Sequence, residues 1–343
     1  GEHIGLLDAW GDDGRVNDFI TQTPQVWIDC QYHLRDGGLF VFWDALQAQF
    51  APGLLDTLFD AYVGLLQRLA SDDAAWTAID PLPLPPPQAQ VRERVNGLVA
   101  ALAPDRLHAR FVRSARQHPE RPAVLGQGAA MSYGELHVQV RDIAARILQA
   151  LGRRPDAAPA PVVAVVMPKG WQQVAGVLAV LAAGAVVLPL DADLPAARLA
   201  WMLGDAGADL VLVRAQGPAG LADPADPGLP QLVVEDRLTH SDAGTDWPVR
   251  PHDGLACIIY TSGSSGEPKG ARIGEPGLVN AIDYTLQRFG IDHQARLLAL
   301  TPLHHDMACF DLFGALSVGA AIVMPEPAGA RDPGHWLQLM RSH

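Results

Sequence analysis

The chain has 343 residues, 49% of them hydrophobic, which is enough apolar material for more than one core, so we expect two domains or parts of domains. Its formal net charge of -13 and the lack of a long basic run argue against a nucleic-acid partner. Its longest apolar stretch, residues 174–190, contains Gly184 and Pro189, and therefore predicts a helix followed by a strand, not a membrane span.

The cysteines indicate a reducing compartment. Cys30, Cys257 and Cys309 each stand among apolar residues, their number is odd, and their spacing fits neither a disulfide framework nor a metal site. The first residues, Gly-Glu-His-Ile, lack the charged and apolar regions of a signal peptide. We therefore expect a cytoplasmic protein without a metal site of its own.

A stretch near the start of the chain predicts a β-hairpin. Apolar and polar residues alternate along two runs that flank the turn-forming pair Asp36-Gly37. This register sets Asp29 opposite Asp44, and two like charges cost free energy unless a cation, a donor or a shared proton compensates them. The conflict indicates a functional site; the alternative is a bulge near Trp43 that sends one aspartate to solvent. The same register gives an apolar face of three pairs, Leu34 with Leu39, Tyr32 with Val41 and Cys30 with Trp43.

Parts of this hairpin resemble a known motif. The sequence TQTPQVWID at residues 21–29, with Trp43-Asp44 after it, resembles the last core motif of heterocyclization domains, the condensation-domain variants that turn Cys, Ser or Thr residues into thiazoline or oxazoline rings. The resemblance implies that residues 1–76 are the C-terminal part of a chloramphenicol-acetyltransferase-like condensation fold. Asp29 and Asp44 are then the candidate catalytic residues, which assist cyclization and dehydration. The threonine motif that the family pairs with this aspartate is absent from the chain.

Two further segments follow the hairpin. Apolar residues from Gly53 to Ala70 recur at helical spacing and predict one long helix that packs in a core. Five prolines between residues 81 and 87 then predict a stiff, extended segment. We place a linker at residues 77–105, where its position and composition resemble the connection between condensation-type and adenylation domains.

The remaining residues alternate between strands and helices, which predicts βαβ units and a layered α/β fold. Apolar runs predict strands at 161–167, 185–190, 210–213, 255–260 and 297–303, and helical stripes predict helices at 171–183 and 278–289.

The segment TSGSSGEPKG, residues 261–270, follows a predicted buried strand and has the composition of a phosphate-binding loop. Glycines let successive N–H groups surround an anion, hydroxyls add donors, and Lys269 adds a positive charge. Pro268 and Gly270 flank the lysine, which excludes a Walker A loop, and a flexible linker needs no Thr, Pro and Lys beside a core strand. The predicted phosphate-binding residues are Thr261, Ser262, Gly263, Ser264, Ser265, Gly266, Lys269 and Gly270.

The segment PLHHDMACFDLFG, residues 302–314, follows the last predicted strand. Its adjacent His304 and His305 would point to opposite sides of an extended chain, which argues against a metal site. Asp306 has two interpretations. Its carboxylate pairs with a substrate ammonium in a dry pocket, or it caps the helix that follows.

The loop at 261–270 resembles the signature loop of the adenylate-forming enzymes, which include acyl-CoA synthetases, luciferases and the adenylation domains of nonribosomal peptide synthetases. MSYGEL at 131–136, LAAGAVVLPLD at 181–191 and the segment 302–314 resemble further adenylation motifs. The resemblance implies that residues 106–343 are the N-terminal part of an adenylation domain. It implies that Asp306 holds an α-amino group, and that Met307 and Phe310 line a side-chain pocket closer to the cysteine-activating pattern than to the serine or threonine ones.

The resemblance therefore implies a synthetase module that uses ATP and Mg²⁺ to activate an amino acid and loads it on the phosphopantetheine of a peptidyl carrier protein. The partners are the amino acid, carrier domains and the rest of the synthetase, with no nucleic acid and no membrane. The family's ribose-binding aspartate and catalytic lysine are expected after His343, so we expect the isolated chain to be inactive or nearly so. The alternatives are an acyl- or aryl-CoA ligase, which shares the loop, and a non-catalytic scaffold of partial domains.

Overall fold

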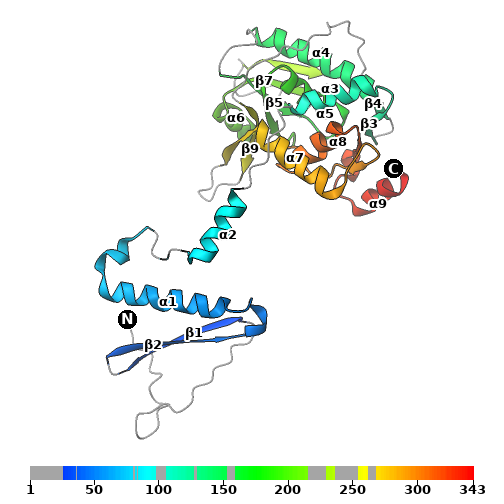
Figure 1. The fold of residues 1–343 in the computed structure, drawn as a ribbon. Coiled ribbons are helices and arrows are strands. Elements are labelled where there is room, and N and C mark those ends of the chain that lie inside the picture. The colour runs from blue at the N-terminus through cyan, green and yellow to red at the C-terminus, as the bar shows by residue number, and fades with distance from the viewer. Residues whose placement is uncertain are drawn as a thin grey trace. The chain divides into compact units, whose positions relative to one another are not determined.

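The computed structural model divides the chain into two compact units, Gly1–Ala100 and Ala101–His343 (Figure 1). The boundary falls inside the segment where we expected a linker. Within the described part of the chain, no helix is both long enough and apolar enough to span a membrane. The structure describes residues 26–35, 37–79, 82, 84–97, 106–126, 130–152, 159–214, 229–235, 254–261 and 268–343.

The first unit contains the predicted hairpin, β1 (Ile28–Arg35) and β2 (Gly38–Ala45). The strands pair antiparallel in the register that the sequence predicts, with Asp29 opposite Asp44. The pairing runs without a shift through Trp43, so the alternative of a bulge at this residue is wrong. The two-residue connection fixes which residues pair. A slip by one residue would move the apolar side chains to the opposite face of the hairpin.

A short 3₁₀ turn, η2 (Gln47–Gln49), leads from the hairpin to helix α1 (Leu54–Ser71), which matches the predicted long helix and is followed by η3 (Asp73–Thr77). The Trp43 ring packs against Phe59 and Tyr62 of α1, with ring centroids 5.4 Å apart in both pairs. The apolar face of the hairpin therefore contacts the helix. We expected the stripe of α1 to be core, but none of its side chains is fully buried.

The prediction that the proline-rich segment is extended throughout is wrong in its second half. Helix α2 (Pro86–Asn96) occupies it, with prolines at its first two positions. Proline fits there because its fixed φ suits a helix, and because the first N–H groups of a helix have no partner within the helix.

The second unit is built on a six-stranded sheet in the order β10-β9-β6-β5-β7-β8. Neighbouring strands are parallel except β10, which pairs antiparallel with β9 at the edge. The near-continuous apolar strands suit a sheet covered on both faces. The strands are β5 (Val162–Val166), β6 (Val186–Leu190), β7 (Ala208–Arg214), β8 (Gln231–Val234), β9 (Leu255–Thr261) and β10 (Lys269–Gly274).

Helices cover both faces of this sheet, which confirms a layered α/β fold. On one face, α5 is buried from Gln172 to Ala182 and shares a core with α3, α4, α7 and a second sheet (Figure 1). On the other face, α6 packs against β5, β6, β7 and β9. The helices are α3 (Leu107–Gln117), α4 (Tyr133–Leu151), α5 (Trp171–Ala182), α6 (Ala196–Asp205) and α7 (Glu275–Phe289).

The second sheet has four strands in the order β11-β12-β3-β4. The predicted strand at 297–303 is too long, because the chain leaves the sheet after Leu298 and turns toward Asp306. The strands are β3 (Pro122–Leu125), β4 (Met131–Ser132), β11 (Arg296–Leu298) and β12 (Ala321–Val323), and the remaining helical segments are η4 (Phe310–Gly314), α8 (Ala315–Ser317), η5 (Pro327–Gly329) and α9 (Pro333–Ser342).

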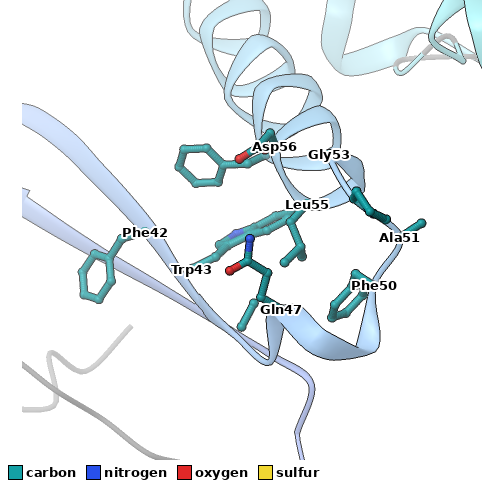
Figure 2. A pocket seen from close by; sticks show the side chains of 11 residues that line it. Phe42, Trp43, Gln47, Phe50, Ala51, Gly53, Leu55 and Asp56 are labelled. Atoms are coloured by element: carbon teal, nitrogen blue, oxygen red, sulfur yellow. The ribbon is translucent and has the colours of Figure 1, made fainter.

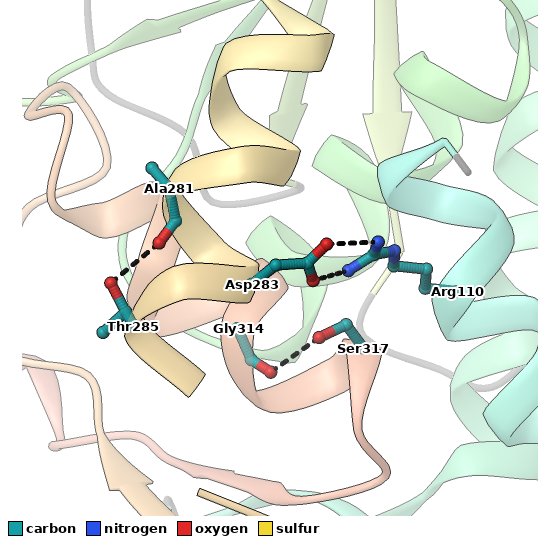
Figure 3. A network of polar contacts seen from close by, with 6 residues as sticks. All are labelled: Arg110, Ala281, Asp283, Thr285, Gly314 and Ser317. Carbon is teal, nitrogen blue, oxygen red and sulfur yellow. Dashed lines mark hydrogen bonds and ion pairs between the residues drawn. The ribbon is translucent and has the colours of Figure 1, made fainter. Parts of the chain in front are cut away.

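Helices α3 and α7, far apart in sequence, are joined by two polar contacts. The buried carboxylate of Glu275 accepts a hydrogen bond of 2.7 Å from the Leu107 N–H and so caps α3. The guanidinium of Arg110 makes a two-pronged ion pair with Asp283 of α7 (Figure 3). These contacts fix the register between the two helices.

We expect Asp283→Ala to lower the free energy of unfolding of the second unit by about 1–3 kcal/mol, because it removes the carboxylate from a largely buried guanidinium. Asp283→Asn keeps one acceptor oxygen, so it should lower the free energy of unfolding by less. Urea denaturation followed by circular dichroism measures both. Wild-type midpoints for the two variants would contradict this role of the ion pair.

Candidate adenylate-forming site

The two ends of the predicted phosphate loop face each other across a strand pair. Lys269 opens β10 and pairs with Thr261, which closes β9, and Gly270 pairs with Tyr260. Because β9 runs parallel to β6, the loop leaves the carboxyl edge of the sheet, as predicted. The predicted residues Ser262, Gly263, Ser264, Ser265 and Gly266 lie outside the described residues.

The side chains of Thr261 and Lys269 are exposed at this edge and open to a ligand. Tyr260, just before the loop, donates a hydrogen bond of 2.6 Å to the Asp205 carboxylate at the end of α6. Burial, and next this hydrogen bond, raise the pKa of Tyr260 well above its ordinary value. The loop therefore starts from an anchored position.

Gly270 lies close to the neighbouring strand. A Cβ atom there would come within 3.1 Å of Ile258 Cγ2 and 3.3 Å of the Tyr260 ring. A larger residue would therefore crowd these two side chains of β9, next to the backbone that carries Lys269.

The segment after β11 forms a tight turn around Asp306. The Asp306 Oδ1 atom accepts a hydrogen bond of 2.8 Å from the Met307 N–H, and its carbonyl oxygen accepts one of 3.0 Å from the Cys309 N–H. The capping interpretation is wrong, since η4 has Cys309 as its N-cap and no capping side chain; the carboxylate instead holds the turn before η4. It also remains exposed, as does Met307 at 62%, whereas Phe310 is half-buried. The Asp306 carboxylate is therefore open to a cation from solvent.

The expected orientation of the two histidines is wrong. The ring centroids of His304 and His305 lie 4.7 Å apart, because the chain turns here instead of staying extended. Burial lowers the pKa of His304, against an opposing effect of Asp191. Across the described ranges, no group of three His, Cys, Asp or Glu residues has the geometry of a metal site.

The structure brings strand β9 and the Asp306 segment together. Both line a small apolar cavity of about 20 Å³, to which β9 contributes Cys257 and the other segment contributes Leu303, Ala308 and Cys309. A hydrogen bond between the two thiols raises the pKa of Cys257 and lowers that of Cys309. The strand that leads into the phosphate loop thus packs against the segment that presents Asp306.

Sequence reasoning missed Lys169, which follows β5. Its Nζ donates hydrogen bonds to the carbonyl oxygens of Ala299 and Thr301, at 2.7 and 2.6 Å. Burial lowers its pKa to about 8, against an opposing effect of Asp311. A signal existed: the chain has two lysines, Lys169 and Lys269, and each closely follows a buried strand.

In the first unit, the two predicted aspartates sit side by side on the hairpin. Asp29 is half-buried and accepts a hydrogen bond of 3.0 Å from the Gln31 side-chain amide, while Asp44 is exposed. A donor next to Asp29 is one of the compensations that the like-charge pair requires.

A pocket of about 580 Å³ lies between β2 and the start of α1 (Figure 2). Trp43, Gln47 and Asp56 are among the residues that line it, but Asp29 and Asp44 are not. The Trp43 Nε1 atom is buried and has no hydrogen-bond partner within the described part of the chain. The structure thus sets the predicted aspartates beside this pocket, not in its wall.

We expect Asp44→Asn to raise the free energy of unfolding of the hairpin unit by about 0.2–1 kcal/mol near pH 7, because it removes one of two facing charges. Urea denaturation followed by tryptophan fluorescence tests it, with Asp60→Asn on α1 as the control. A loss of stability would mean that the Asp44 carboxylate has a stabilising partner.

Comparison with known proteins places this geometry in a family. Residues 111–343 match the AMP-binding enzyme family model. Pyochelin synthetase PchE of Pseudomonas aeruginosa is 38% identical over 336 residues, which cover 98% of this chain and 22% of that protein. Phenyloxazoline synthase MbtB of Mycobacterium tuberculosis is 38% identical over 347 residues, covering 99% of this chain and 24% of MbtB. The chain thus spans about a quarter of the length of these relatives.

Solved structures agree with the sequence matches. The crystal structure of the nonribosomal peptide synthetase FmoA3 (S1046A) superimposes with a TM-score of 0.70 at 34% identity, covering 94% of this chain and 34% of that one. Its AMPPNP-bound form matches equally well. The fold, the loop position and the match over two thirds of its length show that the chain belongs to the AMP-binding enzyme family and has nonribosomal peptide synthetases among its homologues.

Proposed function

We propose that the chain takes part in the ATP-dependent activation of an amino acid as an aminoacyl-adenylate, with cysteine favoured over serine and threonine. One observation carries the proposal. The strand that leads into the phosphate loop packs against the segment that presents the exposed carboxylate of Asp306. A triphosphate and an ammonium can therefore be bound by adjoining segments, and simple acids have no ammonium to pair with Asp306.

In the proposed reaction, a carboxylate oxygen of the amino acid forms a bond to the α-phosphorus of ATP, and the bond from that phosphorus to pyrophosphate breaks. Asp306 orients the substrate through its ammonium. Thr261 and Lys269 donate to the phosphates, and the positive charge of Lys269 favours the charge that moves onto pyrophosphate. Mg²⁺, bound with ATP, would neutralise further charge on the phosphates.

We further propose the division predicted from the sequence: residues 1–76 as the C-terminal part of a heterocyclization domain, 77–105 as a linker and 106–343 as part of an adenylation domain. The similarity to a phenyloxazoline synthase over 99% of the chain supports it, since that match includes the hairpin unit. Asp29 and Asp44 would assist ring closure, and the activated residue would pass to the phosphopantetheine thiol of a carrier protein.

ATP–pyrophosphate exchange in the natural full-length protein tests the activation step. We expect exchange with cysteine above that with serine or threonine, and none with aryl or fatty acids. Exchange with such acids alone would instead identify an acyl- or aryl-CoA ligase. Calorimetry with ATP and Mg²⁺ tests the remaining alternative, because a non-catalytic scaffold should show no heat of binding.

A further inference from the structure

Lys169 links two segments that lie far apart in sequence. It stands between β5 and α5, half-buried, and its ammonium reaches the backbone 130 and 132 residues later. The two acceptors are the carbonyl oxygens of Ala299 and Thr301, which both follow the end of β11. The hydrogen bonds are short and charge-assisted, which makes them stronger than neutral ones.

The same backbone is held from a second side. The Asp311 Oδ2 atom accepts a hydrogen bond of 3.1 Å from the Thr301 N–H. Thr301 therefore has its N–H bound by Asp311 and its carbonyl bound by Lys169. Burial is the main cause that lowers the pKa of Lys169, with Asp311 as the opposing charge, which agrees with an enclosed position for this side chain.

The clamped backbone leads directly to Asp306. From Thr301 the chain runs through two successive turns, closed by hydrogen bonds of 3.0 Å from the His305 N–H to the Pro302 carbonyl and 3.1 Å from the Ala308 N–H to the His305 carbonyl. This path is short, and a hydrogen bond closes each of its two turns. A shift of Thr301 is therefore transmitted to the Asp306 carboxylate.

We propose that Lys169 is a positioning residue for the amino-acid substrate: together with Asp311 it clamps Thr301, and thereby fixes where the Asp306 carboxylate meets the substrate ammonium. This inference rests on the proposed amino-acid activation. Lys169 touches no reacting atom in this account. If Lys169 were only structural, replacing it would lower the stability of the fold. It would not weaken the binding of the amino acid more than the binding of ATP.

Lys169→Met tests the clamp, since methionine keeps the apolar stem and removes the ammonium. Hydrogen exchange followed by mass spectrometry should show faster exchange over residues 299–308. In the natural full-length protein, KM for the amino acid should rise about 10- to 100-fold, because misplaced contacts cost catalysis about this much. KM for ATP should stay within about twofold of the wild-type value. The exposed Arg288→Met on α7 is the matched control and should change neither readout.

Two further variants separate positioning from folding. Lys169→Arg keeps a cation with several donors and should restore most of the amino-acid KM. Asp311→Asn keeps an acceptor for the Thr301 N–H, so it should shift KM in the same direction as Lys169→Met but less. If Lys169→Met fails to fold, KM for the amino acid in these two variants still tests whether the clamp positions Asp306.

An unchanged exchange pattern in Lys169→Met, or an equal rise in KM for both substrates, would overturn the inference. A wild-type protein without amino-acid-dependent activation would remove the proposed function. In that case the hydrogen-exchange result would still show whether Lys169 holds the segment, so the two failures are distinguishable.

Discussion

Replacing Asp306 by alanine is expected to lower kcat/KM for amino-acid activation by a factor of about 30 to 4,000. Truncating one partner of a buried charge pair typically costs about 2–5 kcal/mol, and each 1.4 kcal/mol is a factor of ten. The carboxylate is exposed in the structure, so its pairing energy arises when the substrate covers it. Pyrophosphate exchange at varied amino-acid concentrations measures the loss.

Two comparisons make this prediction specific. Asp292→Ala removes an exposed aspartate that accepts a hydrogen bond from the Gln294 N–H in another turn, and it should leave activation unchanged. KM for ATP should also remain near wild type in Asp306→Ala. If activation tolerates the loss of Asp306, no ammonium is recognised there, and the acid-ligase alternative gains the advantage.

Replacing Lys269 by methionine is expected to lower kcat about 100- to 1,000-fold. This is the typical effect of losing one well-placed donor to a developing charge, about 2.7–4 kcal/mol. The backbone of Lys269 is held by its pairing with Thr261, so the substitution should leave the strand in place. The loss should appear mainly in kcat, because charge on pyrophosphate is greatest as it departs.

Arg272→Met on the same strand is the matched control, since it also exchanges an exposed cation for methionine. We expect it to retain most of the wild-type kcat. Circular dichroism melts of both variants should agree within a few degrees. Equal losses of kcat in the two variants would mean that the general charge of β10 matters, and that Lys269 has no special role.

Local patterns predicted much of the fold. The hairpin register follows from alternation and a two-residue turn, and both act within one short stretch. The βαβ unit around α5 follows from long apolar runs, and its observed bounds, 162–166, 171–182 and 186–190, lie within two residues of the predicted ones. Gly290 follows the last residue of α7 with a positive φ of 61°, a conformation that suits glycine.

The elements that were missed depend on contacts from elsewhere in the chain. Strand β10, KGARIG, has no alternating apolar pattern and forms because β9 offers it a ladder of hydrogen bonds. The strand predicted at 297–303 stops at Leu298, where Lys169 and Asp311 bind the backbone beyond it. Helix α2 was missed because prolines break a helix in its interior but suit its first turn.

The site could be predicted only in part for the same reason. The loop and Asp306 stand out by composition, and the structure shows that strand β9, which leads into the loop, lines one cavity together with the segment around Asp306. Lys169 was missed because its partners are two carbonyl groups 130 and 132 residues away, and its place after a buried strand is the only local signal.

Detection of the adenylate itself tests the central claim most directly. The natural full-length protein would be mixed with ATP, Mg²⁺ and equal amounts of cysteine, serine, threonine and an aryl acid, and the quenched mixture analysed by mass spectrometry. We predict that cysteinyl-adenylate is the main product. An adenylate of the aryl acid alone, or no adenylate at all, would contradict the account.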